Sequence, residues 1–216
     1  MFRAVLFDMD GVLVDTEWFY NRRRVAYLED HGFVFDKVPD LSGSNETAIW
    51  EYFVPDDPQY REELRLGYRE YQKDHPVPYS ELLNSHARPV IEELHAHGIL
   101  CAIASSSYRE LIDELADIAD LKGLLDYTVS GHECMAFKPD PEIYLRAMDA
   151  LGVKPSECLV IEDSPMGIEA GRRAGATVFA LRPHEGTVLD QSNADLIIDD
   201  LSQLLALVDS SADVVR

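Results

Sequence analysis

Acidic side chains stand directly after two apolar runs of this chain. Asp8 and Asp10 follow the run at residues 4–7, and Glu162 and Asp163 end a later run. Carboxylates gathered in one place repel one another and raise one another's pKa values. A divalent cation relieves this repulsion, and hard oxygen ligands with room for water and phosphate favour Mg²⁺. The pattern therefore predicts an acidic Mg²⁺ pocket, provided that the two runs lie side by side.

A hydroxyl group and a lysine complete the set of reactive side chains. Ser105 follows a third apolar run, and Lys138 lies in the loop before a helical pattern. Phosphate monoesters react very slowly, so their enzymes combine in-line positioning, charge neutralisation and protonation of the leaving group. A carboxylate nucleophile divides the reaction into two displacements through an aspartyl-phosphate, and a carboxyl group two residues on can protonate the departing oxygen and then activate water. We therefore predict phosphoryl transfer, with Asp8 as the nucleophile.

Each of these residues also has a simpler interpretation as part of a helix cap. Asp163, Ser164 and Pro165 resemble a helix start with proline at its first position. Ser107 and Glu110 match the S-x-x-E capping box. Capping is the better explanation for any one of these residues alone, but their joint placement favours a site.

The elements that must position this chemistry alternate along most of the chain. Buried strands are predicted at residues 4–7, 99–104, 127–129, 159–161, 177–181 and 196–198. Amphipathic helices are predicted at residues 88–97, 108–118, 139–151 and 165–174. Such alternation gives right-handed βαβ units and a doubly wound parallel α/β sheet of the Rossmann-like kind, whose chemistry lies at the carboxyl ends of the strands.

One stretch breaks this alternation, because no convincing strand occurs between residues 16 and 84. Helical patterns fill it instead, at residues 18–30, 46–53 and 59–74. We therefore predict a core domain of residues 1–15 and 86–216 with an inserted α-helical cap of residues 16–85.

Composition limits the partners. The chain of 216 residues has 40 acidic and 19 basic side chains, a formal net charge of -21. Nucleic acids and anionic membranes require basic patches, so neither is expected as a partner. Three cysteines without C-x-x-C spacing, and the lack of a fitting signal peptide or membrane span, predict a cytoplasmic protein. The arginine run at residues 22–24 is predicted to be a solvated helix face, with one arginine reaching a cleft.

Four segments, taken in order, resemble the motifs of the haloacid dehalogenase superfamily of phosphotransferases. They are FDMDGVLVDTE at residues 7–17, IAS at residues 103–105, KPDP at residues 138–141 and IEDSPMGIEAG at residues 161–171. A lone DxD would be weak, whereas four ordered motifs that span nearly the whole chain are specific to this family.

The resemblance implies a role for each motif residue. Asp8 would be the nucleophile and a Mg²⁺ ligand, and Asp10 the general acid and base, with its backbone carbonyl also on the metal. Asp163 would be the third protein ligand, and Glu162 would lie at or near the metal shell. The groups that hold the transferring phosphoryl group would be Ser105 and Lys138.

The position of the insert resembles the helical cap of the subfamily that contains β-phosphoglucomutase and many small sugar phosphatases. Thr16 would then be a hinge, and the loop around Gly43 and Ser44 would select the substrate. Tyr20 would face the cleft, or else pack the cap helices. Lys73 would match a cap lysine of the mutases, or else belong to a solvated helix face.

Two departures separate this chain from the mutases. Glu46 stands where the mutases have an arginine, and Tyr20 replaces their histidine. We therefore predict a monomeric phosphatase of a small phosphorylated metabolite, such as a sugar or polyol phosphate. A β-phosphoglucomutase-type mutase is the alternative, and a non-enzymatic phospho-receiver or degenerate binding module is a more distant one.

Overall fold

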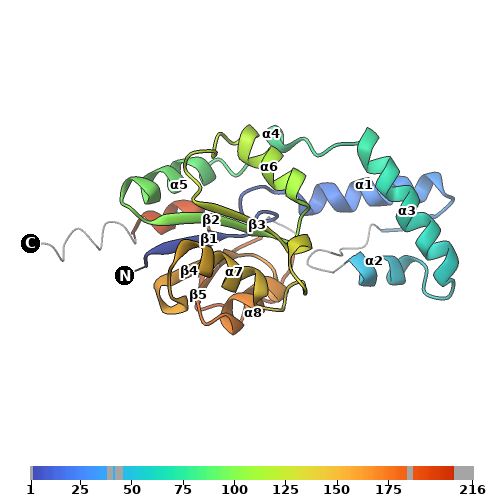
Figure 1. Cartoon of the computed structure of the whole chain (residues 1–216). Helices are drawn as coiled ribbons and strands as arrows, with labels where there is room; N and C mark the ends of the chain where they lie inside the picture. The colour runs from blue at the N-terminus through green and yellow to red at the C-terminus, as the bar shows by residue number, and fades with distance from the viewer. Residues whose placement is uncertain (1, 38–40, 42–45, 184–186, 207–216) are drawn as a thin grey trace, which may run out of the picture. The chain divides into compact units, whose positions relative to one another are not determined.

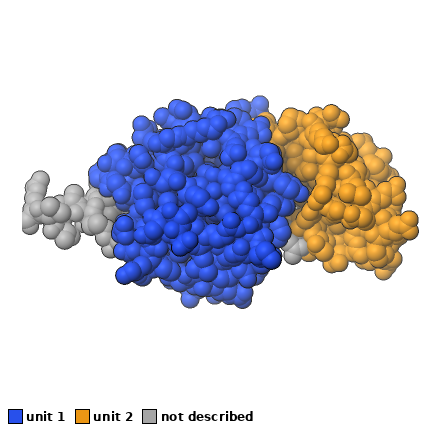
Figure 2. Space-filling model, in the orientation of Figure 1, with its two compact units in different colours: residues 1–15, 79–216 blue, residues 16–78 orange. Residues whose placement is uncertain are grey.

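The computed structural model describes residues 2–37, 41, 46–183 and 187–206. The chain forms two compact units, coloured separately in Figure 2: unit 1 is Met1–Asp15 with Tyr79–Arg216, and unit 2 is Thr16–Pro78. The predicted insert ended at residue 85, but residues 79–85 pack within unit 1. Backbone N–H groups explain this difference, because Asp15 donates to the carbonyl of Leu82 and Asn84 donates to that of Leu13, each at 2.9 Å.

Unit 1 is built on a parallel sheet of six strands in the order β3-β2-β1-β4-β5-β6, which confirms the predicted fold class (Figure 1). The strands are β1 (Ala4–Phe7), β2 (Leu100–Ser105), β3 (Tyr127–Ser130), β4 (Cys158–Glu162), β5 (Thr177–Leu181) and β6 (Leu196–Ile198). The strand order reverses between β1 and β4, so the crevice beyond their carboxyl ends is the expected place for a site.

Helices cover both faces of this sheet. Figure 1 shows α7 (Glu142–Leu151) and α8 (Pro165–Arg173) on one face, and α5 (Ala87–Ala96) and α6 (Arg109–Ile118) on the other. Single-turn elements escaped prediction because one turn has no periodicity to read: α4 (Tyr79–Leu82) and the 3-10 helices η1 (Gly131–Glu133), η2 (Pro155–Glu157) and η3 (Leu201–Leu204).

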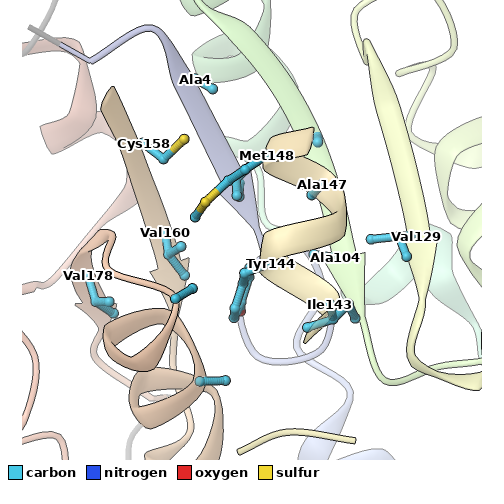
Figure 3. Packing of buried hydrophobic residues seen from close by; sticks show 14 of the residues in the cluster. Ala4, Ala104, Val129, Ile143, Tyr144, Ala147, Met148, Cys158, Val160 and Val178 are labelled. Carbon is cyan, nitrogen blue, oxygen red and sulfur yellow. The ribbon is translucent and has the colours of Figure 1, made fainter. Parts of the chain in front are cut away.

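A hydrophobic core between α7 and the strands attaches this helix to the sheet. Figure 3 shows the buried side chains of α7 packed over the strands, namely Ile143, Tyr144, Ala147 and Met148. On the neighbouring helix, a Cβ at Gly171 would lie 2.8 Å from Val178 Cγ2. The missing side chain at Gly171 therefore allows α8 to pack closely on β5.

The described part of unit 2 contains three helices: α1 (Glu17–Asp30), α2 (Glu46–Phe53) and α3 (Pro58–Asp74). Their common core is aromatic, since the rings of Tyr27, Trp50 and Tyr68 lie 5.4–6.5 Å apart between centroids. Such edge-on and tilted contacts bury large apolar areas with specific geometry. Pro58 begins α3, and the Asp57 carboxylate accepts from the Tyr60 N–H at 2.9 Å, a well-formed N-cap.

One arginine of the run at residues 22–24 is not on a solvated face, which corrects the sequence interpretation. Arg23 is buried, and its guanidinium donates to the Tyr68 hydroxyl at 3.2 Å and to the His75 carbonyl at 2.7 Å. It therefore ties α1 to the end of α3, whereas Arg22 is exposed. Within the described part of the chain, none of the helices combines the length and apolar character needed to cross a membrane.

Candidate active site

The strand ladder fixes the position of Asp8. Its backbone N–H donates to the Ile161 carbonyl at 2.9 Å, which continues the pairing of β1 with β4 by one residue. The chain then turns tightly, with Gly11 at φ +82°. A Cβ at Gly11 would lie 2.1 Å from Asp163 Oδ2, so only glycine lets this loop approach the second acidic segment. The two predicted acidic segments therefore do meet.

Asp10 is held by a residue that the sequence analysis assigned to another task. The Ser107 hydroxyl donates to Asp10 Oδ2 at 2.7 Å. The predicted capping box of Ser107 with Glu110 is wrong, because Tyr108 is the N-cap of α6 and makes no side-chain cap hydrogen bond. The hydroxyl has a distant carboxylate partner instead of a local backbone one.

Lys138 is the buried cation of the site. Its Nζ lies 2.5 Å from Asp8 Oδ1 and 2.7 Å from Glu162 Oε1, and it donates to the Ala104 carbonyl at 3.0 Å. The residue is 8% exposed. Burial acts to lower the pKa of Lys138, but the two carboxylates outweigh it and raise that pKa well above its ordinary value. The paired carboxylates therefore favour the charged form of Lys138.

Glu162 is 0% exposed and accepts hydrogen bonds on both carboxylate oxygens. Oε1 accepts from Lys138 and from the Tyr144 hydroxyl at 2.8 Å, while Oε2 accepts from the backbone N–H groups of Asp163 and Ser164 at 3.1 and 3.2 Å. Burial would raise the pKa of Glu162, but Lys138 and these hydrogen bonds lower it. Glu162 is thus an ionised anchor for Lys138, and its place at the metal shell stays a prediction.

Tyr144 is a site residue that the sequence analysis missed. Its hydroxyl donates to Glu162, and its ring lies 4.9 Å from Lys138 Nζ, a cation–π contact. Burial and the neighbouring Glu162 raise the pKa of Tyr144 well above its ordinary value, so the hydroxyl keeps its proton as a donor. A tyrosine at the start of an amphipathic helix looks like an ordinary core residue, and nothing local indicated this role.

Three buried acids, Asp8, Glu162 and Asp163, offer ligand atoms within 4.8 Å of one another. Burial, followed by the charges of Glu162 and Asp10, raises the pKa of Asp8 to about 8 even though Lys138 acts to lower it. A carboxylate held so unfavourably gains from a nearby cation, and an all-oxygen donor set suits Mg²⁺. The residues present therefore fit a divalent metal ion.

The first turn of α8 packs against the acidic segment at Glu162. Ser164 is its N-cap and accepts from the Gly167 N–H at 3.1 Å, and Pro165 occupies the first turn, both as predicted. A Cβ at Gly167 would lie 1.7 Å from Glu162 Oε1. The carboxylate of Glu162 occupies the space that a side chain at Gly167 would fill. Glycine is therefore needed at position 167 for this carboxylate, whereas at position 171 it is needed for packing on the sheet.

Ser105, the predicted phosphate-binding hydroxyl, lies buried at the end of β2 opposite Ser130 of β3. Its Oγ accepts from the Ser107 N–H at 3.0 Å. The loop that carries Ser105 therefore also carries the partner of Asp10. Its contact with a phosphoryl group stays a prediction.

The predicted substrate residues of the insert lie in unit 2. Thr16 is buried and precedes α1, and its carbonyl accepts from the Tyr20 N–H at 2.9 Å. The Lys73 side chain is 68% exposed and pairs with Glu70 at 2.7 Å, which is the solvated-face alternative. Gly43 and Ser44 lie outside the described residues.

Unit 2 has a polar pocket of its own, with a cavity of about 170 Å³. It is lined by residues of α1 and α2 and by one residue between them: Glu17, Tyr20, Asn21, Arg24, Leu41, Glu46 and Ile49. Burial lowers the pKa of Arg24, while Tyr68, Glu17 and Glu46 act to raise it. Tyr20 thus lines a pocket, and beside it lies Arg24, a member of the run from which one arginine was expected to reach a cleft.

Comparison with known proteins identifies the family. A model of the haloacid dehalogenase-like hydrolases matches residues 2–175. A phosphoglycolate phosphatase from Aquifex aeolicus is 30% identical over 96% of this chain and 97% of its own length. A phosphorylated carbohydrates phosphatase from Thermotoga maritima is 35% identical over 80% of this chain and 81% of its own. The chain belongs to the haloacid dehalogenase-like hydrolases.

Solved structures agree with this assignment. A HAD family hydrolase from Deinococcus radiodurans, solved with bound phosphate and sodium, is 26% identical and has a TM-score of 0.73 over 98% of this chain and 96% of that one. The predicted family is confirmed. The prediction of a phosphoric monoester hydrolase is also confirmed at the level of enzyme class, since the named relatives are phosphatases.

Proposed function

We propose that this protein is a Mg²⁺-dependent phosphatase that hydrolyses a small phosphorylated metabolite, a sugar or polyol phosphate, through an aspartyl-phosphate on Asp8. The observation that supports this most is the contact of Lys138 Nζ with both Asp8 and Glu162. A fixed, buried cation beside a carboxylate is in place to neutralise charge on a phosphoryl group that joins that carboxylate.

In the first step, an oxygen of the Asp8 carboxylate attacks phosphorus while the ester O–P bond breaks. The departing alkoxide takes a proton from Asp10, which Ser107 holds in position. Ser105 and Lys138 hold the oxygens of the transferring group. The products of this step are the free alcohol, the aspartyl-phosphate and an ionised Asp10.

In the second step, water attacks phosphorus and gives a proton to Asp10 as the Asp8–phosphorus bond breaks. Inorganic phosphate leaves, and both aspartates return to their starting states. When bound, Mg²⁺ supplies positive charge near the transferring oxygens. The residues that would hold it are Asp8, Asp163 and the Asp10 carbonyl, with Glu162 at or near the shell.

The pocket of unit 2 favours a phosphatase over a mutase. A mutase must bind a second phosphate group in its cap, which requires basic side chains. Here the pocket contains Glu17 and Glu46 beside Arg24, and Glu46 also lies 3.8 Å from the guanidinium groups of Arg65 and Arg69. Two carboxylates oppose a second phosphate, so water is the better acceptor. The named relatives act on phosphoglycolate and on phosphorylated carbohydrates, which supports a small phosphorylated substrate.

The test is a screen of phosphorylated metabolites with Mg²⁺, in which both released phosphate and isomerised product are measured. We expect phosphate release from at least one sugar or polyol phosphate and from p-nitrophenyl phosphate, with both activities lost in EDTA and in Asp10→Asn. Conversion of β-glucose 1-phosphate into glucose 6-phosphate without phosphate release would show a mutase. No turnover of any ester would indicate a receiver or a binding module.

A further inference from the structure

Gln191 connects the segment beyond β5 to the acidic end of the sheet. Its side-chain Nε2 donates to the backbone carbonyl of Asp163 at 2.8 Å and to that of Leu181 at 2.7 Å. Gln191 is 6% exposed, and it lies outside every motif of the sequence. One buried amide group thus bonds two strand ends at the same time.

The two carbonyls belong to strands that part at this point. The β4–β5 pairing ends with Glu162 opposite Ala180, so Asp163 and Leu181 each come one residue further along. In a continuing parallel ladder, backbone groups of the two strands would bond each other. Instead, the Gln191 amide supplies the donor that these buried carbonyls need. A side chain therefore replaces the next rung of the ladder at the residue where the chain leaves β4.

The segment that carries Gln191 is itself fixed to the sheet. The Gln191 carbonyl accepts from the Ala194 N–H at 3.0 Å, and Arg172 donates to the Asn193 carbonyl at 2.8 Å. The Asp195 carboxylate accepts from the Val178 N–H at 2.8 Å. The amide is therefore mounted on a turn with contacts to both α8 and β5.

Asp163 is consequently held through both of its peptide groups. Its N–H donates to Glu162 Oε2 at 3.1 Å, and its carbonyl accepts from Gln191. With the backbone fixed on both sides, the carboxylate is limited to side-chain rotation in the space that Gly11 leaves open. Loss of either bond would let the peptide rotate and carry the carboxylate with it.

We propose that Gln191 is a positioning residue that directs the Asp163 carboxylate toward the metal site. This inference rests on the Mg²⁺-dependent function proposed above. Groups that orient metal ligands from outside the coordination shell typically change affinity 10–100-fold when they are removed. Gln191→Met keeps the length of the side chain and removes both donors.

The experiment titrates the full, metal-depleted protein with Mn²⁺ and follows free Mn²⁺ by electron paramagnetic resonance. We expect Gln191→Met to weaken Mn²⁺ binding about tenfold or more. The Mg²⁺ concentration for half-maximal hydrolysis of p-nitrophenyl phosphate should rise by a similar factor, while kcat at saturating Mg²⁺ stays within about threefold. A role confined to stability would lower Tm and leave the Mn²⁺ affinity unchanged, and that outcome would overturn the proposal.

Gln203→Met is the matched control, because the Gln203 side-chain oxygen also bonds two backbone groups, the N–H groups of Asp199 and Asp200. It should leave Mn²⁺ affinity unchanged. Gln191→Asn keeps an amide group but is one methylene shorter, so it should also weaken Mn²⁺ binding. This variant replaces Gln191→Met in the experiment if the methionine variant does not fold. Asp163→Asn separates the proposed metal site from the proposed role of Gln191. If this variant binds Mn²⁺ as the wild type does, the metal site itself is wrong. If Asp163→Asn weakens Mn²⁺ binding but Gln191→Met does not, only the role of Gln191 is refuted.

Discussion

The acidic end of unit 1 and the polar pocket of unit 2 are built in different ways. Lys138 and Glu162 are buried, each is bonded by several named groups, and each lies at or beside a strand end. The pocket is lined largely by side chains of two helices, and the buried Nε of its half-buried Arg24 has no hydrogen-bond partner among the described residues. Chemistry common to a family requires preorganised charges, whereas selection among substrates can rest on side chains that vary without disturbing a backbone ladder.

The largest effect is expected where unit 1 would form a covalent bond. Asp8→Asn removes the nucleophile while keeping the size of the side chain, so kcat should fall by a factor on the order of 10⁴ or more. Hydrolysis of p-nitrophenyl phosphate in excess Mg²⁺ measures it. Asp149→Asn, an exposed change on α7, should leave kcat unaltered. Retention of more than a few per cent of activity in Asp8→Asn would contradict the covalent route.

Removal of the buried cation tests how far the rigidity of unit 1 depends on charge pairing. Lys138→Met leaves the carboxylates of Asp8 and Glu162 without their shared partner, which should cost about 3–5 kcal/mol in the free energy of unfolding. Activity should fall about 10²–10³-fold at the same time. Urea unfolding and steady-state kinetics measure the two losses. The control is Lys122→Met, whose ion pair with Asp117 is exposed and should contribute under about 1 kcal/mol. Equal stability of the two variants would refute this account.

The protonation of Asp8 makes stability and metal binding at the acidic end of unit 1 depend on pH. Its pKa in the folded, metal-free protein is raised to about 8 from an ordinary value of 3.8, mainly by burial. Between these two pH values the folded form keeps a proton that the unfolded form loses. The contribution of protonated Asp8 to the free energy of unfolding is therefore fully present below pH 3.8 and is lost as the pH rises through 8. Metal binding must displace that proton, so metal affinity should increase with pH up to about 8 and then level off.

Isothermal titration with Mg²⁺ in buffers of different ionisation enthalpy measures the proton release. We expect about one proton per metal ion near pH 6.5 and almost none above pH 9. The Asp8→Asn variant should release none through this group. A release that does not depend on pH would show that Asp8 is already ionised in the metal-free protein.

The smallest effect is expected in unit 2. Arg24→Met removes the basic group of the pocket and should lower kcat/KM for the preferred metabolite about tenfold, the loss of one charged hydrogen bond. Hydrolysis of p-nitrophenyl phosphate should change less than twofold. Arg22→Met is the matched control, because Arg22 is exposed on the same helix, and it should alter neither rate. Equal losses for both substrates in Arg24→Met would mean that the pocket affects the chemistry itself.

Much of unit 1 could be predicted because its information is local. Strands such as β1 and β5 were predicted at their observed ends from apolar runs alone. The rule that chemistry lies at the carboxyl ends of parallel strands then brought Asp8 and Asp163 together. Local information also served in unit 2, where helix periodicity placed α2 at its observed bounds.

The failures share a physical cause, which is competition from partners far away in the sequence. Ser107 matched a capping box, but its hydroxyl bonds Asp10, which lies 97 positions away. Arg23 belongs to a short basic run on a helix, which is typical of a solvated face, yet its partners lie 45 and 52 positions on. Tyr144 and Gln191 belong to no motif, since each acts through contacts that only the folded chain creates.

Gly167 links a helix to the lysine of the active site. Its missing side chain leaves the volume that the Glu162 carboxylate occupies, and Glu162 in turn bonds Lys138. A methyl group at Gly167 would push that carboxylate aside and release the ammonium group from its anchor. Helix propensity alone would count Gly167→Ala as stabilising. If Lys138 binds phosphate as proposed, the substitution would instead weaken phosphate binding without any change in the pocket of unit 2.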